Sequence, residues 1–143
     1  MALTKASDFV GGGGFFNVKE HMSDLALLIE PKSVRKDVPN EYEGRTSLRD
    51  EVKADVSVFA NQADLDAKKP SQVLKGVTFV HVLLTRDLEP LVGGGTVVTL
   101  DKTQKGSYCM RPPAADAEAA AEAYYEARNS AADAFDDSEF DED

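Results

Sequence analysis

The chain has 143 residues, 42% of them hydrophobic, and a formal net charge of −10. This length suits one domain with an extension and leaves little room for two domains. No apolar run approaches the roughly 18 to 20 residues that span a bilayer, and residues 1–16 lack the apolar segment of a secretory signal. We therefore expect neither a membrane anchor nor export. The single cysteine, Cys109, excludes an internal disulfide.

The negative charge is confined to the C-terminal end. Residues 1–113 contain 15 Lys and Arg and 15 Asp and Glu, whereas residues 114–143 contain one Arg and 11 acidic residues, which gives −10. A low isoelectric point usually argues against nucleic-acid binding, because affinity depends on neutralising phosphates. Here the acidic segment can be physically separate from a binding surface. We divide the chain into a folded domain, 1–113, and an acidic extension, 114–143.

The N-terminal lead, residues 1–22, is rich in glycine. Gly11 to Gly14 form an uninterrupted run, and glycine loses more conformational entropy than other residues when it is held in regular structure. Phe15 and Phe16 follow the run directly. Two aromatic side chains at this place can serve as an arm that stacks on bases or as a plug over one end of the fold. We favour the plug.

Three strands are predicted in the next part of the chain. Residues 25–34 form the first, and the polar, turn-rich segment 35–50 is expected to be a long loop. Residues 51–60 alternate between two sets of side chains, one of them wholly apolar, which is the period of a half-buried strand. Residues 76–85 are β-branched and apolar, as in a strand buried on both faces. A polar connector, 61–75, joins these two strands.

A short helix and two strands complete the predicted domain. Residues 86–92 have helical spacing of apolar side chains and precede three glycines, which fits a helical turn with a glycine stop. Residues 96–102 and 107–111 predict the last two strands, joined by a hairpin turn at 103–106. Five strands with a helix between the third and the fourth follow the order of the OB-fold, a five-stranded, partly open barrel. An SH3-like barrel stays an alternative.

The acidic extension predicts a helix followed by a disordered end. Residues 114–128 are rich in alanine, with acids early and Arg128 late, as the helix dipole favours. Residues 133–143 form an acidic run that is expected to be disordered. Two phenylalanines lie within this run, and pure solubilisation needs no aromatic residues. We therefore predict that partner proteins bind the tail through Phe135, Asp136, Asp137, Glu139, Phe140, Asp141, Glu142 and Asp143.

The sequence holds no recognisable catalytic or metal-binding motif. The glycine run lacks the Lys and Ser or Thr of a phosphate-binding loop, both histidines stand alone, and paired-cysteine spacing is absent. Acidic residues around Glu41 and Asp50 are interleaved with Arg45 and Arg49, which favours a solvated loop over a metal site. We predict a protein that is not an enzyme and that uses no metal or cofactor.

Basic residues gather in two regions that an OB-fold places beside an oligonucleotide groove. One group surrounds the predicted loop 35–50, and the other lies in the last hairpin. Proteins that bind single strands combine cations with aromatic platforms, and each stacked base contributes roughly 1 to 3 kcal/mol. For Phe59 core packing is an equal alternative, and for His81 the role stays open. The predicted contact residues are Lys32, Arg35, Lys36, Tyr42, Arg45, Arg49, Lys53, Phe59, His81, Lys102, Lys105 and Tyr108.

Several stretches resemble the single-stranded DNA-binding proteins of bacteriophages, especially those of actinobacterial phages. They are LALLIEPKSV (25–34), EVKADVSVF (51–59), GVTFVHVLLTRDL (76–88) and GGGTVVTLDKTQKGSY (93–108). The resemblance implies an OB-fold that binds and protects single-stranded DNA, with little sequence preference, during replication or recombination in the cytoplasm of the infected bacterium. It also implies that the acidic tail contacts replication or recombination proteins. Tails of this family often end on an aromatic residue, whereas three acidic residues follow Phe140 here.

Two other functions stay open. A phage-encoded acidic inhibitor that mimics DNA, and so blocks a host nuclease or defence protein, would carry acids over its folded surface. The neutral residues 1–113 argue against it. A structural or assembly protein with a small β-barrel is the third class. A homo-oligomer is compatible with all three.

Overall fold

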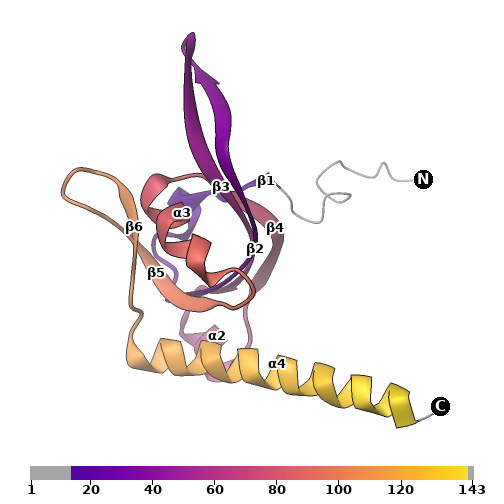
Figure 1. Cartoon of the computed structure of the whole chain (residues 1–143). Coiled ribbons are helices and arrows are strands. Elements are labelled where there is room, and N and C mark those ends of the chain that lie inside the picture. Colours follow the sequence, from indigo (N-terminus) through magenta and orange to yellow (C-terminus); the bar gives the residue numbers. More distant parts are fainter. Residues whose placement is uncertain (1–13, 142–143) are drawn as a thin grey trace, which may run out of the picture.

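The fold is built on one six-stranded sheet (Figure 1). The computed structural model describes the backbone of residues 14–141, and the side chains of that range except those of Tyr42 and residues 131–141. The order across the sheet is β1-β4-β3-β2-β5-β6, and only β1 and β4 pair in parallel. The prediction of a mainly β domain is confirmed. The strands are β1 (Gly14–Phe15), β2 (Ala26–Tyr42), β3 (Arg45–Phe59), β4 (Gln72–Phe79), β5 (Thr96–Lys102) and β6 (Tyr108–Arg111).

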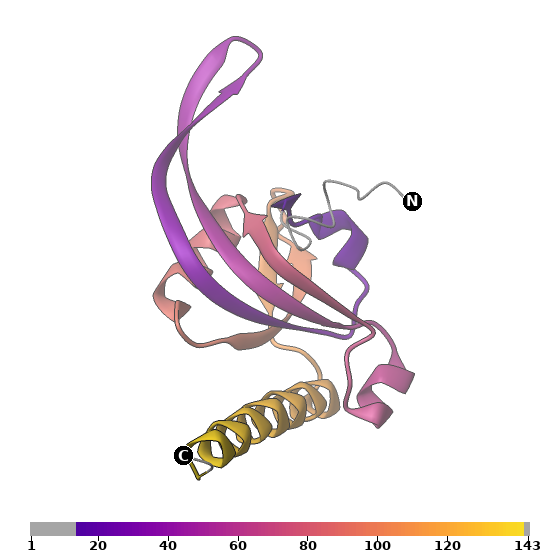
Figure 2. The same ribbon diagram turned by 90° about the vertical axis from the view of Figure 1, so that its right-hand side faces the viewer.

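Two details of the predicted five-stranded barrel are corrected. The described residues form six strands rather than five, because Gly14 and Phe15 add a short strand beside β4 that the glycine-rich lead did not reveal. The sheet is also open, since β1 and β6 are its two edges and do not pair with each other. The strands nevertheless curve around a common interior (Figure 2).

The predicted helix between the third and fourth strands is present between β4 and β5. It consists of α3 (Val82–Leu88) and the 3-10 turn η2 (Glu89–Leu91). The helix begins at Val82 rather than at Arg86, so the strand predicted over 76–85 ends earlier, at Phe79. An apolar run of this length fits a buried strand and a buried helix equally well.

Strands β2 and β3 continue beyond the body of the sheet as a long two-stranded arm (Figure 1). Their register runs from Ala26 opposite Phe59 to Tyr42 opposite Arg45, with irregularities in β2 that allow the strand to bend. A tight turn at Glu43–Gly44 joins them, and both residues have positive φ. The prediction of a loop over 35–50 is therefore wrong. Both faces of the arm carry mostly exposed side chains, so no apolar alternation marks it in the sequence.

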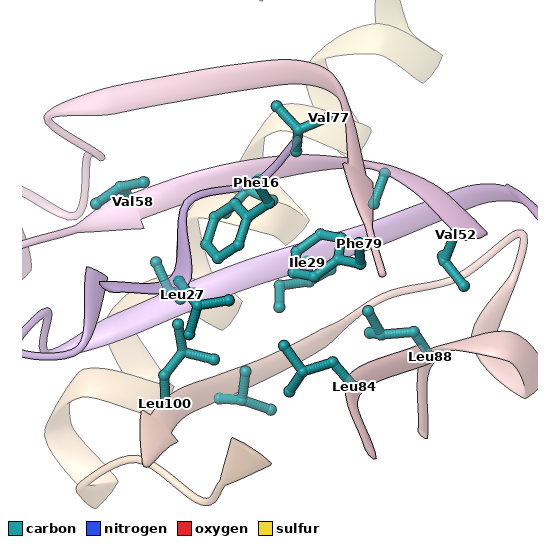
Figure 3. Packing of buried hydrophobic residues seen from close by; sticks show 14 residues of the cluster. Phe16, Leu27, Ile29, Val52, Val58, Val77, Phe79, Leu84, Leu88 and Leu100 are labelled. Atoms are coloured by element: carbon teal, nitrogen blue, oxygen red, sulfur yellow. The ribbon is translucent and has the colours of Figure 1, made fainter. Parts of the chain in front are cut away.

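The interior of the curved sheet is filled by apolar side chains (Figure 3). Leu84 and Leu88 of α3 pack into it. Phe16 follows β1, is buried, and stacks on Phe79 with the ring centroids 4.5 Å apart. Phe16 thus forms the plug that the lead predicted. Alternate positions of β3 also point inward, as their period predicts: Val52, Ala54, Val56 and Val58.

The opposite, outer face of the sheet is partly covered by helices (Figure 2). The long helix α4 (Ala115–Asp141) and the short helix α2 (Gln62–Ala67) pack on it. The prediction of a helix over 114–128 is confirmed. Disorder over 133–143 is not what the structure shows up to Asp141, because α4 continues to that residue. A second hydrophobic cluster lies between these helices and the sheet, and its buried residues are Ala26, Phe59, Leu65, Ala117, Ala120 and Ala121.

One ion pair fixes α4 to the sheet. Arg128 donates from Nη1 to Oε1 of Glu30 at 2.8 Å and from Nη2 to Oε2 at 2.6 Å. The Glu30 side chain on β2 is only 8% exposed, whereas that of Arg128 is 35% exposed. The hydrogen bond to Glu30 raises the pKa of Arg128. The guanidinium also lies over the rings of Tyr124 and Tyr125. Helix α4 and strand β2 are therefore joined by a charge-assisted contact.

Candidate nucleic-acid interface

Aromatic and cationic side chains meet at the open edge of the sheet, between β1 and β6. Phe15 belongs to β1, His81 immediately precedes α3, and Tyr108 is the first residue of β6. Together with Phe16 and residues 17–19 they line a hollow of about 380 Å³. The site thus lies where the two edges of the sheet approach each other without pairing.

Two of the predicted contact residues, His81 and Tyr108, line this hollow, and a third, Lys102, lies beside Tyr108. The rings of His81 and Tyr108 meet edge to face, with centroids 4.9 Å apart and an interplanar angle of 71°. Lys102 lies opposite Tyr108 in the β5–β6 ladder, and its Nζ is 5.2 Å from the centre of the Tyr108 ring. Lys102 is exposed and forms no ion pair with any described residue. Its charge is therefore available to an anion beside an aromatic ring.

Phe15 is an exposed aromatic residue at the hollow that the predicted contact set did not include. It is 66% exposed, and the guanidinium carbon of Arg49 lies 5.4 Å from the centre of its ring. The signal was the Phe doublet after the glycines, but its two members have different roles. Phe16 is the plug, and Phe15 points to solvent as the stacking alternative requires.

Arg49 retains unused donor capacity at the site. Its Nη2 lies 3.4 Å from Glu51, but its Nε is buried without a hydrogen-bond partner among the described residues. An unpaired buried donor is unfavourable. The role of Arg49 as a DNA contact stays a prediction.

The protonation of His81 depends on its position in this cluster. Partial burial lowers its pKa below the ordinary value of 6.5, and the positive charge of Arg49 lowers it further. The imidazole is therefore neutral at pH 7 and presents an uncharged ring to the hollow. In acid it adds a third cation beside Arg49 and Lys102.

Lys53 joins the cluster through the register of the sheet. Lys53 on β3 lies opposite Thr78 on β4, and Thr78 lies opposite Phe15 on β1. Residues opposite one another share a face of the sheet, so Lys53 and Phe15 lie on the same side, separated by one strand. Lys53 is exposed. A DNA strand with one base stacked on Phe15 can therefore place a phosphate near Lys53.

The remaining predicted cations fall into two groups. Lys32, Arg45 and Lys105 are exposed and make no ion pair with described residues, and Arg45 shares a face of the arm with Arg49 because side chains alternate along β3. Arg35 and Lys36 are already paired, at 3.6 Å from Glu51 and 2.8 Å from Glu89 respectively. The hydrogen bond to Glu89 raises the pKa of Lys36. These two cations are less available to phosphates than predicted.

The prediction of Phe59 as a stacking residue is wrong. Phe59 is fully buried and packs beneath α4, with the ring of Tyr124 edge-on at 5.8 Å. It lies on the outer face of β3, which the sequence predicts to be exposed to solvent. It is buried there because α4 covers that part of the sheet. The alternative of core packing is therefore the correct one.

No protein-family model, curated protein or solved structure matches the chain. Between residues 14 and 141, no helix combines the length and apolar character needed to cross a membrane. Among the described side chains, which end at residue 130, no three His, Cys, Asp or Glu residues are grouped so that they could hold a metal ion. The function is therefore inferred from the chemistry of the open edge.

The predicted partner-binding tail is described only in part. Glu142 and Asp143 lie outside the described residues, as do the side chains of Tyr42 and of the other tail residues. The roles assigned to them stay predictions. Helix α4 includes the backbone of Phe135, Asp136, Asp137, Glu139, Phe140 and Asp141.

Proposed function

We propose that the protein binds single-stranded DNA, without strong sequence preference, at the hollow between β1 and β6. One observation carries the proposal: two aromatic rings at the hollow each lie beside a cation. The exposed Phe15 has Arg49 at 5.4 Å, and the half-buried Tyr108 has Lys102 at 5.2 Å. Proteins that bind single strands combine aromatic platforms for bases with cations for phosphates. Every base has a π-face, so such a site tolerates any sequence.

The strand order supports the same proposal. Apart from β1, the chain has five strands, β2 to β6, with helix α3 between the third and the fourth of them. We assign these five strands to an OB-type fold whose sheet stays open, because the edge strands β1 and β6 do not pair. In that assignment the β2–β3 arm and the β5–β6 hairpin are the two loops that OB-folds use for oligonucleotides. Both carry exposed cations, Arg45 and Lys105.

The resemblance to phage proteins supports the further proposal that this activity serves replication or recombination, with the acidic tail recruiting partners. The net charge of −10 is compatible with DNA binding, because residues 114–143 account for all of it and the rest of the chain is neutral. The acidic residues belong to α4 and its end, whereas the hollow is formed by other elements.

Fluorescence anisotropy with labelled oligo-dT and a labelled duplex of equal length tests the proposal. We expect tighter binding to oligo-dT, with affinity falling steeply as salt rises, because each neutralised phosphate releases counterions. Phe15→Ala and Tyr108→Ala should each weaken binding by about 1 to 3 kcal/mol. Lys102→Ala should reduce the salt slope by about 0.7.

Lys69→Ala is the matched control for Lys102→Ala. Lys69 is exposed and follows α2, away from the hollow, so its loss should leave the salt slope unchanged. Absence of oligo-dT binding, or unchanged affinity in both aromatic variants, would refute the proposed site.

A further inference from the structure

A second and larger groove lies where α4 passes β5 and the end of β6. Its volume is about 670 Å³, which falls within the range of roughly 300 to 1,000 Å³ that is typical of ligand sites. It shares no lining residue with the hollow between β1 and β6. The groove therefore requires an explanation that DNA binding does not provide.

The floor of this groove is apolar. Leu28 from β2, Val97 from β5 and Leu91 from η2 line it, together with Pro112 and Pro113 after β6. Leu28 is buried, whereas Val97 and Leu91 are half-buried. The two prolines have no N–H to donate. An occupant therefore gains most by bringing an apolar side chain to this floor.

The rim of the groove is acidic. Glu118 and Glu122 stand one turn apart on α4, and Tyr125 follows on the same face of the helix. Neither glutamate forms an ion pair with a described residue, and like charges at this spacing repel each other. The stripe that docks α4 on the sheet is a different one and includes Ala121 and Arg128.

The other charges at the rim do not offset these glutamates. Asp87 adds a carboxylate, although Arg86 lies 3.2 Å from it. Arg111 is the one cation among the lining residues, and its Nε is already 2.6 Å from Asp101. The groove therefore combines an apolar floor with a negative rim.

We propose that this groove binds a short segment of a partner protein in which an apolar side chain is flanked by lysines or arginines. The apolar side chain packs on Leu28 and Val97, and the cations face Glu118 and Glu122, which relieves their mutual repulsion. Charge argues against two other occupants, because DNA phosphates and the chain's own acidic end are both repelled. The groove is a partner site separate from the proposed DNA interface.

Labelled model peptides test this proposal on the full-length protein by fluorescence anisotropy. We expect KKLFKK to bind, and both EELFEE, with reversed charge, and KKSSKK, without apolar side chains, to bind at least about tenfold more weakly. Glu118→Gln combined with Glu122→Gln should weaken KKLFKK binding about fivefold to tenfold, as the loss of two partly exposed ion pairs implies. Glu118 is half-buried and Glu122 is exposed, and neither pairs with a described cation, so this variant should keep its helix content, which circular dichroism checks.

The control variant Asp116→Asn with Glu126→Gln removes two charges from the same helix outside the groove and should leave KKLFKK binding unchanged. Equal losses in the two double variants would show nonspecific attraction and overturn the proposal. Equal binding of KKSSKK, or self-association of the protein that displaces the peptide, would also overturn it. Failure here is distinct from failure of DNA binding, since the Glu118 and Glu122 variant keeps every residue of the hollow and should bind oligo-dT as the wild type does.

Discussion

Replacing Arg128 with Ala tests how α4 is attached to the sheet. The substitution leaves the Glu30 carboxylate, only 8% exposed, without the cation that neutralises its charge. Breaking a fully buried ion pair costs roughly 3 to 5 kcal/mol, whereas exposed pairs contribute roughly 0 to 1 kcal/mol. Arg128 is itself 35% exposed, so water screens the pair in part. We expect Arg128→Ala to lower the free energy of unfolding by about 2 kcal/mol.

Urea denaturation followed by circular dichroism measures this loss. For a slope of about 1 to 3 kcal/mol per molar urea, the midpoint should fall by roughly 1 M. Adding Glu30→Gln to Arg128→Ala should recover part of the loss, because the buried carboxylate is then gone. Amide hydrogen exchange should show faster exchange in α4 than in β3, since the helix can detach locally.

Arg111→Ala is the matched control. Its Nε–Oδ2 distance to Asp101 is also 2.6 Å, but the two side chains are 56% and 51% exposed. This substitution should leave the midpoint nearly unchanged. An equal loss in Arg111→Ala and Arg128→Ala would refute the reasoning, because burial of Glu30 would then not determine the cost.

Two further predictions concern Phe59 and His81. Phe59→Ala should destabilise the protein by about 3 to 5 kcal/mol in urea denaturation, because it empties a buried site beneath α4; a stable variant that loses only DNA affinity would contradict this. Affinity for oligo-dT should rise as the pH falls below 6.5, because a nearby phosphate favours protonated His81, whose pKa is lowered in the free protein. The same lowered pKa means that the unfolded chain takes up the proton first, so the free protein loses stability over that range. An unchanged pH dependence of DNA binding in His81→Gln would assign the effect to another group.

The sequence predicted best those strands in which one face is buried and the other exposed. The segment 96–102 coincides with β5, and the alternate apolar residues of β3 all point into the core. In these strands the side-chain period of two separates core from solvent. The same alternation is missing from 35–50, where both faces of the arm meet mostly water, so the longest hairpin of the fold was predicted as a loop.

Contacts between distant segments were the part that could not be predicted. Phe59 occupies a position that suggests solvent on β3, and only the placement of α4 shows that it is buried. Arg128 was interpreted through the helix dipole, whereas its main partner is Glu30, 98 residues earlier. The candidate site is similar: the cations and Tyr108 were expected, but the hollow depends on Phe15 reaching the edge of β4.

The parallel pairing of β1 with β4 also determines the order in which the core can be completed. Gly14 lies opposite Val77 and Phe15 opposite Thr78, so the first described strand has no partner until β4 has been synthesised, and chains are made from the N-terminus. The β2–β3 hairpin closes a short loop and forms early, whereas long-range pairs must first overcome a larger loss of chain entropy. We therefore expect Gly14, Phe15 and Phe16 to fold late although they are translated before β4, so that Phe16 seals the core only when the rest of it is in place.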